Sequence, residues 1–493
     1  MVKTYVEDLE KKENPREALS RLRSLIKEEE QRTELMQLIG NGDVLFLYLA
    51  HEDAKTRKNA ALLIGDLKLQ EALPMLKDAY ERETTLFVKS SYLTAMSKLD
   101  VTELLDFFKE QRECLLASEP AEEDKKHVSE ELHELYALIT GIEGRKKHTF
   151  CGLKKPHEIL LSTNREQREV TLGEVSEVSK AVQRRAELHP LGVMVYTKDV
   201  IPFTTLRTYR ELLFPLMEKV SDKPREAAEQ LWNSGLFTFL QECHRQETPF
   251  TFRVEVKDAT PQTEYAKKLS MALEQLSNVN LINDTKDFEV EIRLLATKEN
   301  GYTAFLRLKT IPMHRFSYRK NAIATSIHPA AAAMMLRLAK PYLKQNAQIL
   351  DPCCGVGTML IERDICVPAR EIYGIDLFGD AIVGARENAS LAGEEIHFIH
   401  RDFFDFKHEY LFDEIITNMP VRGKKSKEEV DAFYHSFFQK AASLLVRQGK
   451  LILYTNETGF VKKQLRLHEE YRLLQEFCIR KKEQFYLYII ERR

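Results

Sequence analysis

A strand, a glycine turn and a helix follow one another near residue 350, and this pattern constrains the fold more than any other feature of the chain. A short, mainly apolar strand at 347–350 precedes Asp351, glycines stand at 355 and 357, and a helical pattern continues from Thr358. This order lets the backbone approach a ligand closely at the carboxyl edge of a parallel sheet. It predicts an α/β doubly wound, Rossmann-like domain, for which we expect the bounds 313–493.

Acidic residues at the ends of the next two expected strands indicate the ligand. Asp376 can accept hydrogen bonds from both hydroxyls of a ribose, and Asp402 is placed to accept from an adenine amino group. A dinucleotide motif needs a third glycine, but Leu360 stands three residues after Gly357. The pattern therefore favours a nucleoside without a pyrophosphate, and S-adenosyl-L-methionine is the expected cofactor. The expected cofactor-binding residues are Asp351, Cys353, Gly355, Gly357, Thr358, Asp376, Asp402 and Asn418.

The fourth expected strand, 413–417, ends in the sequence Asn-Met-Pro-Val at 418–421. The side-chain amide of Asn418 and the carbonyl of Pro420 offer two acceptors for the two hydrogens of an exocyclic amine. These bonds help the nitrogen lone pair leave conjugation and attack a methyl group. Asn418 and Pro420 are thus the expected catalytic residues. The alternative is that Asn418 is only the turn residue that ends the strand.

A repeat marks the N-terminal segment. Residues 51–67 recur 32 residues later as 83–99, and each unit contains two amphipathic helices. A period of this size is typical of stacked helix pairs. The pattern resembles HEAT-like repeats over residues 31–117 and predicts an α-helical repeat domain at 1–144. The alternative is an irregular helical domain whose self-similarity is accidental; in either case we expect a surface for contacts.

The segment between these two regions alternates apolar and polar residues in three places. The alternation runs over 250–256, 288–294 and 302–308, with a helical pattern at 261–276 and a hairpin-type Asn-Gly turn at 300–301. The order strand, helix, strand, strand predicts a small α+β domain. We place this middle region at 145–312.

Charge and composition narrow the location and the partners. The net charge of −3 gives no general attraction for phosphate, so nucleic-acid binding would need a local patch. Seven scattered cysteines fit reduced thiols, and they match no metal motif. No apolar run approaches the ~20 residues of a membrane span, and the N-terminus lacks the apolar core of a signal peptide. We expect a cytoplasmic protein with no metal site.

The chain resembles the THUMP-domain RNA methyltransferases, which methylate the exocyclic nitrogen of guanosine in transfer or ribosomal RNA. Their catalytic domain reads D-P-x-C-G-S-G-T then E, and this chain has Asp-Pro-Cys-Cys-Gly-Val-Gly-Thr at 351–358 with Glu362 behind it. Residues 205–210 are similar to the family's L-R-T segment. Residues 315–319, with His328, Pro329 and the alanine-rich helix that follows, resemble its connector into the catalytic domain. The resemblance covers about 150–493. It implies a guanosine-N2 methyltransferase of tRNA or rRNA, with a ferredoxin-like and THUMP-like RNA-binding middle region.

Two features depart from that family. The family's N/D-P-P-Y/F has become Asn-Met-Pro-Val at 418–421, which lacks the aromatic ring that stacks on a flipped-out base. The N-terminal helical repeats are not a standard part of the family. The alternative function is a catalytically degenerate scaffold that binds RNA or protein. A substitute ring could come from Phe403, Phe404, Phe433 or Tyr434, each of which could equally be a core aromatic.

RNA contact would depend on two basic clusters. The first lies in the connector before the catalytic domain, and the second follows the catalytic strand, where phosphates flanking a target base would lie. A solvated charged loop is the alternative for the second cluster. The expected partners are RNA and, through the helical repeats, a protein. The expected RNA-binding residues are Arg315, Arg319, Lys320, Arg422, Lys424 and Lys425, and Lys427 belongs to the second cluster.

Overall fold

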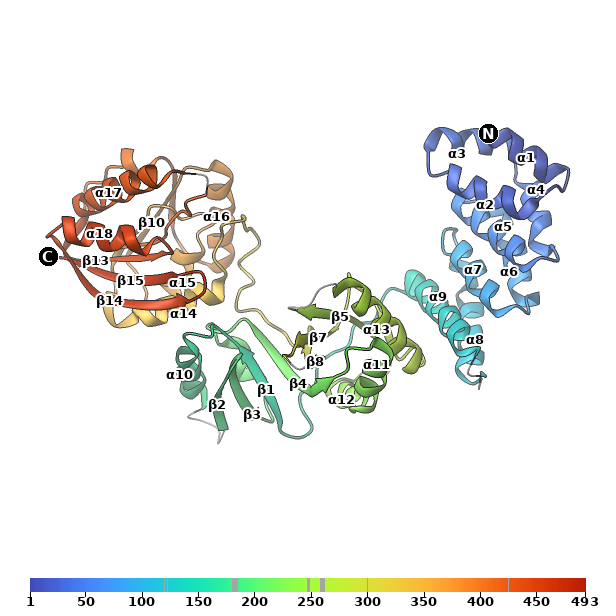
Figure 1. Ribbon diagram of the computed structural model, residues 1–493, viewed down its shortest axis with the longest axis horizontal. Helices are drawn as coiled ribbons and strands as arrows, with labels where there is room; N and C mark the ends of the chain where they lie inside the picture. The colour runs from blue at the N-terminus through green and yellow to red at the C-terminus, as the bar shows by residue number, and fades with distance from the viewer. Residues whose placement is uncertain are drawn as a thin grey trace. The chain divides into compact units, whose positions relative to one another are not determined.

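The computed structural model describes residues 1–118, 120–121, 123–179, 185–245, 249–257, 262–298, 300–423 and 425–493. These residues form two compact units (Figure 1). Unit 1 contains Met1–Thr149 and Leu216–Ala304, and unit 2 contains Phe150–Pro215 and Phe305–Arg493. The chain passes between the units after Thr149 and within strands β4 (Glu211–Val220) and β8 (Tyr302–Leu308). The expected middle region 145–312 is therefore divided between the two units, and the three expected domain bounds stay a prediction.

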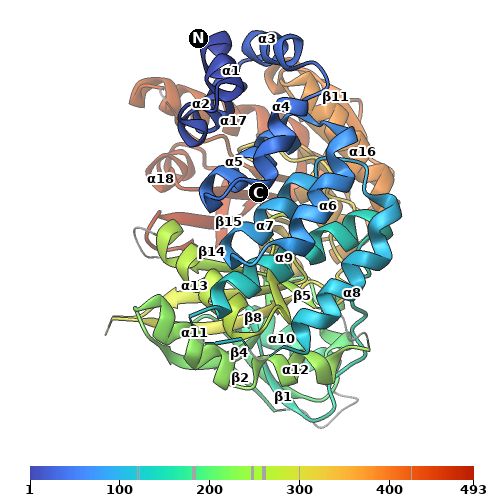
Figure 2. The same ribbon diagram turned by 90° about the vertical axis from the view of Figure 1, so that its right-hand side faces the viewer.

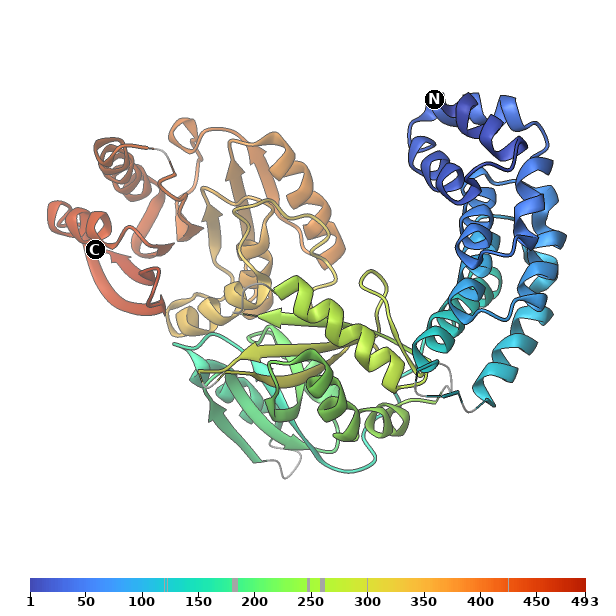
Figure 3. The same ribbon diagram turned by 45° about the vertical axis from the view of Figure 1, so that its right-hand side comes forward.

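Unit 1 begins with helices that pack in succession. The predicted copies at 51–67 and 83–99 coincide with α5 and α7, and α5, α7 and α9 lie side by side (Figures 2 and 3). The helices are α1 (Val2–Glu10), α2 (Pro15–Leu25), α3 (Glu29–Ile39), α4 (Asp43–Phe46), α5 (Ala54–Leu67), α6 (Leu73–Arg82), α7 (Leu86–Met96), α8 (Leu105–Leu116) and α9 (Lys125–Glu143).

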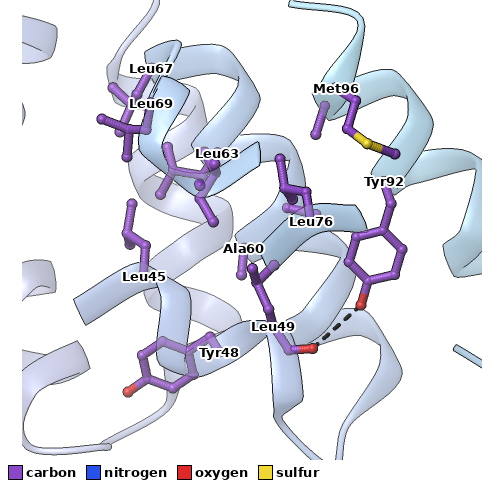
Figure 4. Packing of buried hydrophobic residues seen from close by; sticks show 14 of the residues in the cluster. Leu45, Tyr48, Leu49, Ala60, Leu63, Leu67, Leu69, Leu76, Tyr92 and Met96 are labelled. Atoms are coloured by element: carbon purple, nitrogen blue, oxygen red, sulfur yellow. Dashed lines mark hydrogen bonds between the residues drawn. The ribbon is translucent and has the colours of Figure 1, made fainter. Parts of the chain in front are cut away.

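A glycine permits the close contact between α5 and α7. A Cβ atom at Gly65 would lie 2.6 Å from the Cα atom of Ala95, so no larger residue fits there. The surrounding core is apolar, and Tyr92 buries its ring with its hydroxyl donating to the Leu49 carbonyl at 3.4 Å (Figure 4). Successive helices are also joined by ion pairs, since Arg57 contacts Glu83 at 2.7 Å. This packing agrees with the predicted helix pairs, and their assignment as HEAT-like stays a prediction.

The rest of unit 1 is an α+β segment. Strand β5 (Phe250–Lys257) pairs in parallel with β6 (Leu281–Asn283) and β7 (Val290–Ala296), and helix α13 (Gln262–Leu276) connects β5 to β6. The alternating segments predicted at 250–256, 288–294 and 302–308 thus correspond to β5, β7 and β8. Two further helices, α11 (Pro224–Asn233) and α12 (Leu236–Cys243), precede β5. The THUMP-like assignment of this segment stays a prediction.

Unit 2 opens with a small antiparallel sheet. Strand β1 pairs with β3 and β4, and β2 pairs with the outer edge of β3. One helix, α10, follows β1 in the sequence. Gly192 allows β3 to begin close to β1, because a Cβ atom there would lie 2.0 Å from the Leu161 carbonyl oxygen. The bounds are β1 (His157–Ser162), α10 (Arg168–Ser179), β2 (Arg185–His189) and β3 (Gly192–Thr197).

The C-terminal part of unit 2 confirms the predicted α/β doubly wound fold. Its sheet has the order β11-β10-β9-β12-β13-β15-β14, in which β15 is antiparallel to both of its neighbours, β13 and β14. Strand β9 pairs with β10 along one edge and with β12, which comes later in the chain, along the other. The strands are β9 (Gln348–Asp351), β10 (Glu371–Asp376), β11 (His397–His400), β12 (Phe412–Asn418), β13 (Leu445–Thr455), β14 (Tyr471–Arg480) and β15 (Phe485–Arg492).

Neighbouring strand residues face opposite sides of this sheet, and helices cover both sides (Figure 1). Ile349 belongs to a core with α14, α15 and α16, whereas Leu350 belongs to a second core with α17 and α18. The edge between β9 and β12, where the strand order reverses, is the usual ligand site of such folds. The helices are α14 (Pro329–Ala339), α15 (Thr358–Cys366), α16 (Gly379–Ala392), α17 (Lys427–Leu444) and α18 (Thr458–Leu467).

Two kinds of feature are absent from the described ranges. These ranges contain no helix long and apolar enough to cross a membrane. They also contain no group of three His, Cys, Asp or Glu side chains placed to hold a metal ion. All seven cysteines are free thiols.

Candidate cofactor and substrate site

A cavity of about 1070 Å³ lies in unit 2 at the carboxyl ends of β9, β10 and β12. It brings together both sets of residues that the sequence assigned to cofactor binding and catalysis. Residues of the antiparallel sheet and of the connector also line it. The predicted residues in its wall are Asp351, Cys353, Gly355, Thr358, Asp376, Asp402, Asn418 and Pro420.

Asp351 ends β9 and is almost fully buried. Its carboxylate accepts a hydrogen bond from the backbone N–H of Cys353 at 3.0 Å. Burial raises the pKa of Asp351 to about 7, with a further contribution from the nearby Asp376. Burial likewise raises the pKa of the Cys353 and Cys354 thiols, so neither supplies a thiolate near neutral pH.

The loop after Asp351 depends on two glycines with positive φ angles. Gly355 has φ +52° and Gly357 has φ +80°. At Gly357 a Cβ atom would also lie 2.8 Å from the ring of Phe398. Gly357 is outside the cavity wall, so its contribution is to the shape of the loop.

Asp376 ties this loop to the next strand. Its carboxylate accepts from the backbone N–H of Gly355 at 2.8 Å and from that of Phe378 at 3.0 Å. Asp402 caps the short helix η6 (Phe403–Asp405), accepting from the N–H of Phe404 at 2.8 Å. A carboxylate offers about four acceptor positions, so both groups keep capacity for a ligand.

These groups fit S-adenosyl-L-methionine, which carries an ammonium, a sulfonium, two ribose hydroxyls and an adenine amino group. Three carboxylates line the cavity and suit its cationic and donor groups. The hydroxyl of Thr358 is buried and has no hydrogen-bond partner in the part of the chain that the structure describes, which leaves it available to a polar ligand. The exposed side chains of Leu377 and Phe378 add apolar wall.

The loop after β12 presents Asn418 and Pro420 to the same cavity. The N–H of Met419 donates to the Tyr454 carbonyl at 3.0 Å and so fixes the loop to β13. The Met419 side chain is 2% exposed and packs in the core, whereas Val421 is 52% exposed. The loop therefore provides two carbonyl acceptors and no aromatic ring.

The first predicted RNA-binding cluster is mostly engaged within unit 2. Arg315 donates to the carbonyls of Leu206 and Arg210, at 2.5 and 2.8 Å, and its guanidinium lies 3.6 Å from the ring centroid of Tyr209. Arg315 thus holds the connector against the antiparallel sheet, and its contact with RNA stays a prediction. Arg319 donates to the Ile327 carbonyl at 3.3 Å. The side chain of Lys320 is exposed.

The second cluster lies between β12 and α17. Arg422 is exposed, and its Nε donates to the Lys425 carbonyl at 2.9 Å. Lys425 is exposed and lines the cavity. Lys424 lies outside the described residues. RNA contact by these cations stays a prediction.

Several wall residues were not identified from the sequence. Arg210 lies within the segment 205–210 that was noted only for its similarity to a family motif, and His328 was noted only as part of the connector. No sequence pattern indicated Asn164 or Arg480 as site residues. Asn164 donates to the Ile479 carbonyl at 2.8 Å, which brings β14 to the end of β1. Only the folded chain places these residues together.

Comparisons with known proteins agree with this geometry. Residues 317–482 match the family described as "RMKL-like, methyltransferase domain". A tRNA (guanine(10)-N2)-dimethyltransferase of Methanothermobacter thermautotrophicus is 26% identical over 155 residues, which are 30% of this chain and 45% of that protein. Uncharacterized protein MG259 of Mycoplasma genitalium is 34% identical over 89 residues, 18% of this chain and 20% of that one. The chain thus spans less than half the length of these relatives.

Solved structures share the fold at low sequence identity. TrmN from Thermus thermophilus superposes with a TM-score of 0.51 at 22% identity, covering 68% of this chain and 99% of that one. SMU.472, solved in complex with SAH, gives 0.50 at 17% identity and covers 68% and 98%. Residues 317–482 are therefore similar to methyltransferase domains of the RMKL-like type, and the cofactor of this domain is S-adenosyl-L-methionine.

Proposed function

We propose that this protein is an RNA methyltransferase that transfers a methyl group to the exocyclic N2 of guanosine in tRNA or rRNA. One observation carries the proposal: Asn418 and Pro420 line the same cavity as Asp351, Asp376 and Asp402. A cofactor site and a pair of amine acceptors thus share one enclosed space. The relative that methylates guanine N2 in tRNA supports this choice of substrate.

The residues of the chain bind and orient the reactants. S-adenosyl-L-methionine, when bound, supplies an electrophilic methyl group. Asp376 would accept from ribose hydroxyls, Asp402 from the adenine amino group, and Asp351 would face a cationic group of the cofactor. The Asn418 amide oxygen and the Pro420 carbonyl would accept hydrogen bonds from the two N–H groups of the target amine, which frees its lone pair. The nitrogen would then gain the methyl group as its bond to the sulfonium breaks, leaving the thioether product, and one amine proton would pass to solvent. No covalent nucleophile is needed, which agrees with the neutral thiols of Cys353 and Cys354.

A labelling experiment tests the proposal. The purified protein is incubated with methyl-labelled S-adenosyl-L-methionine and total RNA from a strain that lacks the gene, and the nucleosides are separated by mass spectrometry. Label is expected in N2-methylguanosine or N2,N2-dimethylguanosine, and the Asn418→Ala variant is the matched control. Absence of label from every RNA fraction, or label in another nucleoside, would contradict the proposal.

A second candidate function is a scaffold that binds RNA or protein without turnover. The observation that favours it is the altered loop, in which Met419 is buried in the core and Val421 supplies no ring. Calorimetry combined with the labelling experiment separates the two candidates. A scaffold would show no methyl transfer to RNA even where S-adenosyl-L-methionine binds and the Asp376→Ala variant abolishes that binding.

RNA contact and a protein partner belong to the same proposal. We assign phosphate contacts to Lys320, Arg422 and Lys425, whose side chains are exposed in unit 2. Each phosphate contact releases a counterion. Replacing one of these cations should therefore weaken RNA binding and reduce the slope of log affinity against log salt concentration by about one unit. The helices α1 to α9 offer a surface for a protein partner, which a pull-down with residues 1–144 deleted would test.

A further inference from the structure

Two phenylalanine rings from different elements line the cavity near the catalytic loop. Phe404 lies in η6 and is 37% exposed, and Phe433 lies in α17 and is partly buried. Their ring centroids are 5.8 Å apart at an interplanar angle of 90°. In such an edge-to-face pair, one ring presents only its edge to the other. Aromatic surface is therefore open to the cavity, although the loop 418–421 has no ring.

Both rings are held in place by the protein itself. Phe433 packs parallel to Phe437 at 6.2 Å, and edge-on to Tyr434 at 6.0 Å. The backbone N–H of Phe404 donates to Asp402, and its carbonyl accepts from Lys440 Nζ at 3.0 Å. These two hydrogen bonds hold the backbone of Phe404 in place. Rings that are already ordered lose little conformational entropy when a ligand stacks on them.

A cation accompanies the rings. The Nζ of Lys425 lies 5.4 Å from the ring centroid of Phe433, and Lys425 also lines the cavity. It stands between the catalytic loop and the start of α17. An aromatic face with an adjacent cation matches the two ends of a nucleotide, which are the base and the phosphate.

The other aromatic residues of the site are less suitable. Phe403 is 5% exposed, and Tyr434 is 1% exposed with its hydroxyl bonded to Thr455 Oγ1 at 2.7 Å. Phe485 already stacks on Tyr454 at 5.0 Å. These rings are occupied by the protein. Phe378 also lines the cavity, but in the described residues it pairs with no other ring and no cation, unlike Phe433 with Phe404 and Lys425.

We propose that Phe404 and Phe433, together with Lys425, form the subsite that holds the flipped-out base and a flanking phosphate. The inference rests on the proposed function and deepens it, since it says how the chain replaces the ring that Val421 does not supply. The ligand class is a purine nucleotide within a single-stranded or locally opened RNA. Stacking on one ring changes the affinity for a base by about 5-fold to 150-fold.

Binding of a designed RNA pair tests the subsite without requiring turnover. The first probe is a short fluorescein-labelled oligouridine with one central guanosine, and the second has an abasic site in place of that guanosine. Fluorescence anisotropy with S-adenosylhomocysteine present gives the ratio of the two affinities. Wild type is expected to prefer the guanosine probe by about 5-fold or more. Phe404→Leu and Phe433→Leu should bring the ratio close to one, and Phe404→Trp should restore it.

Two controls separate this subsite from its alternatives. Phe485→Leu removes a ring of the same cavity and should leave the guanosine preference intact. Calorimetry should give S-adenosylhomocysteine the same affinity, within about twofold, for wild type and for both leucine variants. Loss of cofactor affinity in Phe404→Leu would overturn the proposal, because the ring would then hold the adenine of the cofactor.

The other outcomes of the binding experiment also test the base subsite. A wild-type ratio of one, unchanged ratios in both leucine variants, or a loss of preference in Phe485→Leu would each overturn the subsite. If wild type shows the ring-dependent preference and yet transfers no methyl group to any RNA, the base subsite is supported and the proposed guanosine-N2 activity fails. The two proposals thus fail separately.

Discussion

Arg207 forms a two-pronged ion pair with Glu362, in which Nη2 and Nε lie 2.7 and 2.9 Å from the two carboxylate oxygens. The hydroxyl of Tyr318 donates to the same carboxylate at 2.6 Å. Arg207 belongs to the segment 205–210, and Glu362 lies in α15, just after the cofactor loop. The antiparallel sheet and the connector are thus fixed to the helix that follows the cofactor loop. This contact gives a physical reason for finding segment 205–210, the connector and the cofactor loop in one chain.

Loss of Arg207 should destabilise unit 2. Glu362 is 1% exposed, so the Arg207→Ala variant leaves a buried carboxylate with only the Tyr318 hydroxyl. We expect a loss of about 3–5 kcal/mol and a Tm lower by about 6 to 20 °C. Scanning calorimetry measures it, and the unit 2 transition is the one that the cofactor raises. Lys462→Ala removes an exposed pair with Glu476 and should cost less than ~1 kcal/mol; equal shifts would contradict the prediction.

The meeting of three acidic groups at one edge of the sheet could be predicted from the sequence. Asp351 and Asp376 end their strands and Asp402 follows the next one, and the carboxyl ends of parallel strands meet at one edge of a sheet. The positions of these groups depend on local patterns that a linear sequence displays. The same holds for β5, β7 and β8, whose alternation is visible directly, and for α5 and α7, which occur as a repeat.

Contacts between distant segments could not be predicted in the same way. Nothing in the sequence shows that Arg315 is used to join the connector to residues 206 and 210, or that Asn164 reaches the end of β14. The choice of Phe404 and Phe433 among the neighbouring aromatic residues depends on burial, which tertiary packing decides. The division of residues 145–312 between two units depends on how the strands pair.

The shape of the cofactor loop should depend on Gly357. An alanine there would have to adopt φ +80° and would place its Cβ 2.8 Å from the Phe398 ring. Gly393 has a similar φ of +77°, but a Cβ atom there would meet nothing within 4 Å, so Gly393→Ala carries only the backbone cost. Calorimetry should show an affinity for S-adenosylmethionine at least about tenfold lower in Gly357→Ala and within about twofold in Gly393→Ala. Equal affinities in the two variants would contradict the role of the ring contact.

Cofactor affinity should rise with pH because of Asp351. Its pKa is raised to about 7 by burial, so the empty site is mostly protonated at pH 6 and mostly ionised at pH 8. The cationic cofactor favours the ionised form and so releases a proton on binding. We expect about a tenfold increase in affinity between these two pH values. Calorimetry in two buffers of different ionisation enthalpy counts the released proton. Asp351→Asn should remove this part of the pH dependence; a variant that keeps it would refute the assignment.

His328 should make unit 2 less stable in mild acid. Its pKa is lowered to about 4, mainly by burial and also by Arg210, Arg319 and Arg315, while its Nδ1 accepts from the Ala330 N–H at the start of α14. The unfolded chain binds a proton near pH 6.5, so this group's stabilising contribution is complete above that pH and is lost as the pH falls toward 4. His328→Asn keeps a capping acceptor and cannot titrate. The Tm of the variant should fall less steeply between pH 6.5 and 4.5, and an identical slope would count against the prediction.

Asn418 should affect turnover more than binding. Its amide oxygen is one of two acceptors for the target amine, so the Asn418→Ala variant should lose about 100-fold to 1000-fold in kcat, as for other preorganised hydrogen bonds. The family to which the chain is similar has either Asn or Asp at this position, so Asn418→Asp should recover much of the rate. Val421→Ala, an exposed change in the same loop, is the matched control. Single-turnover transfer to RNA measures the rates, and calorimetry measures cofactor affinity separately. If Asn418→Ala weakened the cofactor as much as it slowed transfer, the residue would be a cofactor ligand, and the amine acceptors would have to be sought elsewhere in the cavity.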